Sequence, residues 1–516
     1  MLNLSVLLED SARKFSNKTA FTFMDTSLSF SQVNTAANQV ANGLVDKGIK
    51  PGDKVALSCF NLPYFPIIYN GILKAGAVVV PLSVLLKTDE IQYHLENSDA
   101  KAYFCFIGSD ELPMGKMGYQ AFDATQDCRH FFTIMPKPEM QSAIENTETL
   151  GSLMQGQSPE FDTVATKASD TAVIVYTSGT TGRPKGAELT HSNLMQNTIL
   201  CADLFNTTQN DKMLIVLPLF HIFAMTVQMN VSIYKGVTSI LLPRFEAKTV
   251  LELLEKHEIT FFAGVPTMYW GLNSYLDANK RDLSAITKKL RMCVSGGASL
   301  PVAVLDKFEA HFNVKILEGY GMSEGSPVVS FNQFDVGRKA GSIGTPVWGV
   351  QIKVVDDKGI ELPEGEKGQL VYKGHNVMKG YYNNPQATKN AIKDGWLQSG
   401  DIALKDEDGF FFIVDRTKDM IIRGGLNVYP REVEEVMMKH PAISMVAVVG
   451  IPDEKMGEEI KAHVVLNDGA ELSAETLSEW TKEKIASYKY PRVIEFAKSL
   501  PMSATGKILK KELRKL

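Results

Sequence analysis

Short apolar runs alternate with helix-like segments over most of the chain. The runs at 54–60 (KVALSCF), 171–175 (TAVIV) and 259–266 (ITFFAGVP) are rich in β-branched or aromatic residues, with Gly or Pro close by. Segments with helical spacing lie between such runs. Because buried parallel strands read as continuous apolar runs, this alternation predicts an α/β fold in which helices cover parallel sheets.

The pattern changes near residue 340. Short strand-like stretches such as 368–374 (GQLVYKG) and 409–416 (GFFFIVDR) are separated by turn sequences such as DDKG and DEDG. This spacing predicts a small, mostly antiparallel β-region. After Asp415, a helix around 430–440, two apolar strands and a helix over 471–488 predict a compact α+β module.

The chain has 516 residues, which is too long for a single hydrophobic core. We therefore expect a large N-terminal domain of helix-covered sheets with the small β-region, over residues 1–415. A small α+β C-terminal domain follows over 416–516, and we place the boundary at about Asp415–Lys418.

Charge and cysteine content exclude several classes of protein. Lys and Arg total 54 against 59 for Asp and Glu, a net charge of −5 that gives no electrostatic case for a nucleic-acid partner. The start of the chain lacks the basic and apolar regions of a signal peptide, and no run of about 18 apolar residues predicts a transmembrane segment. We expect a cytoplasmic protein with reduced thiols, because the five cysteines are scattered and form no CxxC pair. Peripheral membrane contact and a homodimer are both left open.

A glycine- and hydroxyl-rich loop follows the apolar run at 171–175. Its sequence is Tyr176-Thr-Ser-Gly-Thr-Thr-Gly-Arg-Pro-Lys-Gly186. Glycine lets the backbone approach a ligand, hydroxyl and N–H groups donate to phosphate oxygens, and Lys185 adds a positive charge. The spacing is not that of a P-loop, and the composition is unusual for an ordinary polar surface loop. The expected phosphate contacts are Thr177, Ser178, Gly179, Thr180, Thr181 and Gly182.

This loop resembles the nucleotide loop of the adenylate-forming superfamily, which includes acyl-CoA synthetases, luciferases and the adenylation domains of peptide synthetases. Matching segments follow in order over nearly the whole chain. They are PLFHIF at 218–223, SGGA at 295–298, EGYGMSE at 318–324, GYY at 380–382, DGWLQSGDIA at 394–403, DRTKDMIIRGGLNVYPREVE at 415–434 and PMSATGK at 501–507. The wording is most similar to bacterial medium- and long-chain fatty acyl-CoA ligases.

The resemblance implies a two-step ligase that uses ATP, Mg²⁺ and coenzyme A. A carboxylate is a poor acyl donor, so the acid first attacks the α-phosphate of ATP, releasing pyrophosphate and forming an acyl-adenylate. The thiol of coenzyme A then displaces AMP. Such a site must bring two anions together and stabilise the charge that grows on the α-phosphate.

The resemblance also assigns roles around the nucleotide. It implies that Glu324 binds Mg²⁺ with Thr177, that Tyr320 packs on adenine, and that Asp401 accepts hydrogen bonds from the ribose. Arg416 would reach the ribose or phosphate, and Ser323 keeps a hydroxyl where the family usually has threonine. Further nucleotide contacts are implied for Gly297, Ala298, Glu318, Gly319 and Gly321.

The C-terminal segments resemble the mobile part of the family. Lys507 corresponds to the catalytic lysine of adenylation, and we expect Lys185 and Glu324 to take part in catalysis as well. Lys418 matches the hinge about which the C-terminal domain rotates between the two steps. The loop formed by Gly424, Gly425 and Leu426 would shape the path of coenzyme A.

The acyl pocket is the least specified part of the site. By resemblance it is lined by His221, Phe223, Gly264, Val265 and Gly296. These segments carry no Lys or Arg to pair with a second carboxylate and no acid to pair with an ammonium group, which favours an apolar acid.

Several alternatives stay open. An aryl acid such as coumarate could replace the fatty acid. A fatty acyl-AMP ligase would pass the acyl group to a carrier protein, although such relatives usually carry an insertion before the hinge that is not evident here. A light-emitting oxygenase and an inactive nucleotide-binding module are further alternatives. The joint presence of Glu324, Asp401, Arg416 and Lys507 argues against the inactive module.

Overall fold

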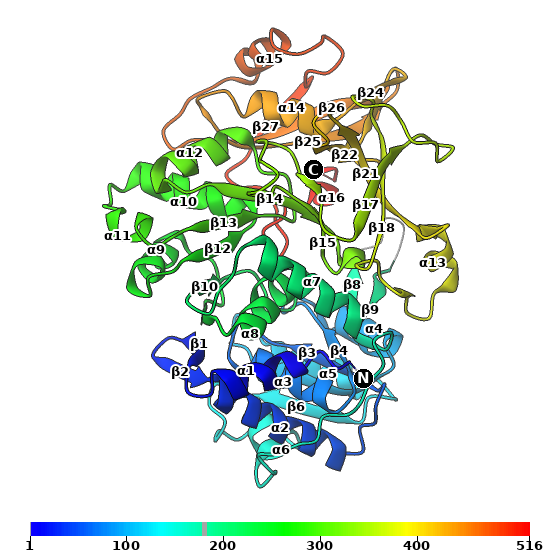
Figure 1. The fold of residues 1–516 in the computed structure, drawn as a ribbon. Coiled ribbons are helices and arrows are strands. Elements are labelled where there is room, and N and C mark those ends of the chain that lie inside the picture. The colour runs from blue at the N-terminus through cyan, green and yellow to red at the C-terminus, as the bar shows by residue number, and fades with distance from the viewer. Residues whose placement is uncertain (1, 178–182, 516) are drawn as a thin grey trace.

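The structure is a computed structural model that describes residues 2–177 and 183–515. Two large sheets, a smaller antiparallel sheet and a C-terminal sheet account for its strands. Figure 1 shows the N-terminal layers in blue and cyan at one end of the molecule and the C-terminal layer in orange and red at the other.

The first large sheet has eight strands, in which a parallel set is extended by antiparallel strands at one edge. The strand that ends at the nucleotide loop lies inside this sheet. In spatial order the strands are β19 (Gly380–Tyr381), β9 (Lys185–Thr190), β8 (Thr171–Thr177), β4 (Val78–Pro81), β3 (Lys54–Ser58), β5 (Ala100–Phe106), β6 (His130–Ile134) and β7 (Glu148–Thr149).

The second large sheet has nine strands and is also mixed, with a parallel centre and antiparallel pairs at both ends. In spatial order they are β16 (Thr345–Pro346), β15 (Val328–Phe331), β14 (Ile316–Gly321), β13 (Met292–Ser295), β12 (Phe261–Gly264), β10 (Lys212–Ile215), β11 (Thr238–Leu241), β1 (Thr19–Phe23) and β2 (Thr26–Ser29).

Helices cover these sheets, as the alternating pattern predicts. One of them, α2, begins at a capping box in which the Ser29 hydroxyl accepts from the Gln32 N–H (3.2 Å) and the Gln32 side chain accepts from the Ser29 N–H (2.8 Å). The helices are α1 (Val6–Lys14), α2 (Phe30–Asp46), α3 (Tyr64–Lys74), α4 (Thr88–Asn97), α5 (Met114–Asp123), α6 (Leu150–Met154), α7 (His191–Leu204), the π-helix η1 (Phe223–Asn230), α8 (Val231–Lys235), α9 (Ala247–Lys256), α10 (Pro266–Ala278), α11 (Ser284–Thr287), α12 (Val302–Phe312) and the 3₁₀ turn η2 (Ser323–Gly325).

The third sheet is the predicted β-region, and all of its pairings are antiparallel. It consists of β17 (Val350–Val355), β18 (Gly368–Gly374), β21 (Trp396–Lys405), β20 (Ile392–Lys393) and β22 (Phe411–Arg416), with α13 (Pro385–Ala391) beside it.

The C-terminal module has its own sheet and its own buried core. Val433 and Met437 of one helix pack there with Val448, Ile460 and Leu477. The elements are β23 (Ile421–Arg423), β24 (Leu426–Val428), α14 (Pro430–Met437), β25 (Ile443–Asp453), β26 (Gly457–Leu466), α15 (Ala474–Lys482), β27 (Val493–Phe496) and α16 (Lys510–Leu513). A large N-terminal domain followed by a smaller C-terminal domain is therefore confirmed, whereas the exact boundary at Asp415–Lys418 stays a prediction.

Two further expectations concern thiols and membranes. Cys59, Cys105, Cys128, Cys201 and Cys293 are all buried free thiols, as expected. Within residues 2–177 and 183–515, no helix combines the length and apolar character needed to cross a membrane.

Gly344 offers a test of the packing beside β16. Its φ is +77°, and a Cβ built there would lie 2.0 Å from the backbone of Phe331. We expect Gly344→Ala to lower the free energy of unfolding by about 3 kcal/mol, because it adds a backbone clash to the cost of the left-handed conformation. Gly359→Ala is the matched control, since Gly359 has a φ of +81° and open space around it. Equal losses in denaturant unfolding would contradict the clash.

Candidate active site

A cavity of about 1310 Å³ lies where the large sheets, the β-region and the C-terminal domain meet. Its walls come from distant parts of the sequence, including the ends of β8 and β14, the hairpin β21–β22 and the loop before α16. The predicted residues that line it are Thr177, Lys185, His221, Phe223, Val265, Gly296, Gly297, Ala298, Gly319, Tyr320, Gly321, Ser323, Glu324, Asp401, Arg416, Lys418 and Lys507.

Other predicted residues are placed elsewhere. Gly264 is buried in β12 and is absent from the described cavity wall. Gly424 and Gly425 form the turn of the β23–β24 hairpin, with φ of +57° and +80°, and Leu426 is half exposed beyond them. Within the described structure these three lie outside the cavity wall. Ser178, Gly179, Thr180, Thr181 and Gly182 lie outside the described residues.

Glu318 is buried one step behind the cavity wall. Its Oε1 accepts a hydrogen bond from the Leu300 N–H (3.0 Å), and burial raises the pKa of the carboxyl to about 7. The side chain thereby ties β14 to the loop that carries Gly297 and Ala298. A direct nucleotide contact from Glu318 stays a prediction.

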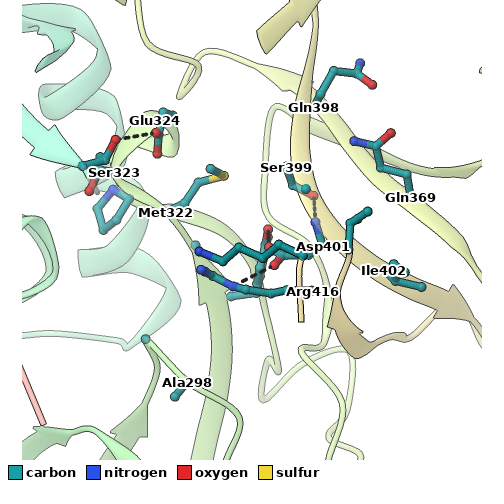
Figure 2. Close-up of a pocket in the computed structure, with 18 of the residues that line it drawn as sticks. Ala298, Met322, Ser323, Glu324, Gln369, Gln398, Ser399, Asp401, Ile402 and Arg416 are labelled. Atoms are coloured by element: carbon teal, nitrogen blue, oxygen red, sulfur yellow. Dashed lines mark hydrogen bonds and ion pairs between the residues drawn. The ribbon is translucent and has the colours of Figure 1, made fainter. Parts of the chain in front are cut away.

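Asp401 makes three polar contacts in the part of the cavity wall that the β-region contributes. Arg416 stands opposite it across the β21–β22 pair, and the Arg416 Nε lies 3.2 Å from Oδ1. The Tyr320 hydroxyl donates to Oδ2. The Asp401 N–H donates to the Ser399 hydroxyl (3.0 Å), as Figure 2 shows. Asp401 is only 5% exposed, and its contacts with Arg416 and Tyr320 fix the orientation of the carboxylate. A carboxylate can accept two hydrogen bonds from a vicinal diol.

Glu324 lies across the cavity on η2, and Figure 2 shows it beside Ser323. Its Oε1 accepts from the Thr177 hydroxyl (3.1 Å) and from the Tyr381 hydroxyl (2.8 Å). The Lys185 Nζ lies 4.9 Å from the centre of the Tyr381 ring. Burial and the Glu324 charge raise the pKa of Tyr381, which keeps the phenol protonated as a donor.

Lys507 enters the cavity on a short C-terminal turn. The Lys507 carbonyl accepts from the Ser503 N–H (2.8 Å), and the Thr267 hydroxyl of the N-terminal domain donates to the Gly506 carbonyl (2.9 Å). Burial, together with the nearby charges of Arg416 and Lys418, lowers the pKa of Lys507 to about 8. Lys507 therefore lines the same part of the cavity as Asp401 and Arg416.

His221 forms part of the apolar wall, next to Phe223. Burial, with a smaller contribution from the Lys507 charge, lowers the pKa of His221 to about 4, so the ring is neutral near pH 7. Its Nδ1 accepts from the Phe223 N–H (3.3 Å), which assigns the proton to Nε2. Both expected roles, packing and lining the pocket, are compatible with this placement.

Several cavity residues were missed in the sequence. Tyr381 lies in the GYY segment, and Gln398 and Ser399 lie in DGWLQSGDIA, so the motifs contained a signal for them. Met322 lies in EGYGMSE in the same way, whereas Gln369 lies in none of the matching segments, and only its side-chain direction brings it to the cavity (Figure 2).

Comparisons with known proteins agree with this geometry. The family described as AMP-binding enzyme matches residues 8–382, and the AMP-binding enzyme C-terminal domain matches residues 432–507. A long-chain-fatty-acid–CoA ligase of Bacillus subtilis is 38% identical and covers 99% of this chain and 94% of its own. A feruloyl-CoA synthase of an Amycolatopsis species is 35% identical, with 98% and 97% covered. ATP-bound MatB from Rhodopseudomonas palustris has a TM-score of 0.90 at 31% identity, with 100% and 99% covered. As its ordered motifs predict, the chain belongs to the family of AMP-binding enzymes.

Proposed function

We propose that this protein joins a medium- or long-chain fatty acid to coenzyme A through an acyl-adenylate. Its class, an AMP-forming acid–CoA ligase, rests on the family match and on relatives that span almost the whole chain. The identity of the acid rests on one observation, the composition of the cavity wall around His221.

This wall is apolar. Leu217, Pro218, Ile222 and Phe223 follow β10, and Val265 adds to them from the start of α10. A Cβ at Gly296 would lie 3.3 Å from the Phe223 ring, so glycine leaves space beside that ring. These five apolar side chains, next to a neutral histidine, suit a hydrocarbon chain better than a second carboxylate or an ammonium group.

The polar residues suit the adenylation step. Asp401 and Arg416 would hold the ribose, and Tyr320 would pack against the adenine. Lys507 would bring its cation to the substrate carboxylate and the α-phosphate, where negative charge develops during the attack. Positioning and fixed charge are the main contributions that the chain itself makes to this step.

The surroundings of Glu324 fit a magnesium ion. Both hydrogen bonds described for this carboxylate end on Oε1, which leaves Oε2 for a cation, and the Thr177 hydroxyl lies alongside. Mg²⁺ typically takes one or two protein carboxylates with phosphate oxygens and water. Glu324 and Thr177 would hold it, and when bound it would neutralise charge on the phosphates.

The lowered pKa of Lys507 predicts a pH dependence. The protonated Lys507 is the active form. At low ATP the rate reports the free enzyme, so pyrophosphate release with a carboxylic acid substrate should fall as the pH rises through about 8. Lys507→Arg should move the decline in the residual activity to higher pH, since arginine stays protonated. Rate profiles that coincide for the two proteins would contradict this assignment.

An acid panel tests the proposed function. Pyrophosphate release and thioester formation are measured with fatty acids from hexanoate to stearate and with coumarate, ferulate and benzoate, with and without coenzyme A. We expect the highest kcat/KM for a fatty acid. The feruloyl-CoA synthase relative makes an aryl acid the second candidate, and a higher kcat/KM for coumarate or ferulate would establish it. Pyrophosphate release without thioester would instead indicate transfer to a carrier protein.

A further inference from the structure

Arg431 makes contacts that its place in the chain does not require. It stands in the first turn of α14, where its Nε lies 2.9 Å from Glu435 within the helix. Its remaining guanidinium nitrogens, however, point out of the C-terminal domain. Nη1 donates to the Ile413 carbonyl, and Nη2 donates to the Gly341 carbonyl (3.4 Å).

Both acceptors belong to the N-terminal domain. Ile413 is in β22 of the β-region, and Gly341 is in the segment that precedes β16. The Arg431 side chain is only 13% exposed, so little water reaches the guanidinium. Because a buried charged donor is costly to leave without partners, these two carbonyls favour the orientation of the C-terminal domain in which they can be reached.

The backbone of Arg431 is tied to the interdomain connection as well. The Arg431 N–H donates to Asp415 Oδ2 (3.0 Å), while Asp415 Oδ1 accepts from the Arg416 N–H (2.7 Å). Arg431 therefore contacts Asp415 in the connection between the domains, and it also contacts two segments of the N-terminal domain. Neither Ile413 nor Gly341 can move with α14 when the C-terminal domain rotates about Lys418.

This is the orientation that places Lys507 in the cavity. The hydrogen bond from Thr267 to the Gly506 carbonyl (2.9 Å) belongs to the same interface, as does the Lys367 ammonium 4.7 Å from the centre of the Tyr429 ring. Among these contacts, Arg431 supplies the one buried guanidinium that bridges two N-terminal segments. The contribution of Arg431 to the domain orientation can therefore be tested separately from that of the turn that carries Lys507.

We propose that Arg431 is a positioning residue that holds the C-terminal domain in the adenylating orientation. The proposal rests on the two-step function above. The domain must leave this orientation for thioester formation, so the Arg431 contacts favour the first half-reaction and oppose the second. Arg431 acts through the placement of Lys507 and touches neither substrate.

The test separates the two half-reactions in Arg431→Met, which keeps the aliphatic stem and removes the guanidinium. Acid-dependent pyrophosphate release without coenzyme A should fall about tenfold, the effect of losing one hydrogen bond to a charged donor. Thioester formation from supplied acyl-adenylate and coenzyme A should be unchanged or faster. Equal loss in both half-reactions, or no change in either, would overturn the proposal.

Lys461→Met is the matched control. The Lys461 side chain is as buried as that of Arg431, and its ammonium forms an ion pair with Glu495 (2.8 Å), but both partners belong to the C-terminal sheet. The control should keep the wild-type ratio of the two half-reactions. The same shift of ratio in Lys461→Met would show that general weakening of the C-terminal domain, rather than the interface, is responsible. If Arg431→Met fails to fold, Arg431→Lys replaces it, because lysine keeps the positive charge but cannot donate to both carbonyls as the guanidinium does.

Cross-linking measures the orientation of the C-terminal domain independently of enzymatic activity. Cysteines introduced by Lys367→Cys and Tyr429→Cys face each other across the interface and should be joined by a short bismaleimide. Adding Arg431→Met should lower the initial cross-linking rate several-fold, and an unchanged rate would overturn the proposal. If wild-type protein releases no pyrophosphate with any acid, the proposed function fails while this measurement still decides the role of Arg431.

Discussion

Replacing Lys507 by alanine should abolish adenylate formation and largely spare thioester formation from a supplied acyl-adenylate. The Lys507 side chain is partly buried and lines the same cavity as Asp401 and Arg416, where its charge is screened less by water than at the protein surface. Loss of a positioned cation at a reacting phosphate typically costs about a hundredfold or more. Single-turnover pyrophosphate release measures the first step, and acyl-CoA formed from synthetic acyl-adenylate measures the second.

The control for this variant is Lys498→Ala. Lys498 precedes the same C-terminal turn and is exposed, so its loss removes a positive charge without touching the cavity. Its two half-reactions should remain within about twofold of wild type. If Lys507→Ala lost both half-reactions equally, Lys507 would be needed for the structure of the site rather than for adenylation alone.

Much of the fold follows from local sequence pattern. The continuous apolar runs at β3, β8 and β12 predicted buried parallel strands, and the DEDG turn predicted the hairpin of β21 and β22. These features depend on neighbouring residues, so a pattern of side chains along the chain is enough to recognise them.

The site depends on contacts that no local pattern contains. The motifs proposed Asp401 and Arg416 separately, but their pairing depends on the register of β21 with β22, which shifts between Ile402 and Ala403. Tyr381 reaches Glu324 only because β19 joins the edge of the first large sheet at β9. Such registers arise from tertiary packing and not from propensity.

The motif containing Glu318 shows a different limit. The resemblance assigns nucleotide contacts to most residues of EGYGMSE, but different parts of β14 place these residues in different surroundings. Glu318 pairs with Ser295 in the parallel part of β14, whereas Tyr320 pairs with Ser330 of β15 further along. The Glu318 carboxyl contacts the Leu300 N–H, while Tyr320 reaches Asp401 in the cavity.

Replacing Lys418 by proline should leave adenylation largely intact and reduce thioester formation about a hundredfold, if Lys418 is the hinge. The Lys418 N–H donates in none of the backbone hydrogen bonds described for the turn from Arg416 to Met420, so proline deletes no donor of that turn. Proline fixes φ near −65° and restricts Thr417 as well, which opposes the backbone change that rotation needs. Overall turnover with coenzyme A and the two separate half-reactions are measured.

Lys418→Ala distinguishes the backbone effect from the loss of charge. The Lys418 side chain lines the cavity near Arg416 and Lys507, so the alanine variant removes a cation there but leaves φ free. Because one repelling neighbour is lost, its adenylation should persist to slightly higher pH than in wild type, while its thioester formation should stay within about threefold. The proline variant should differ from it only in the second half-reaction. Unchanged overall turnover in Lys418→Pro would place the hinge elsewhere in the connection, and matching losses in both variants would assign the effect to the charge.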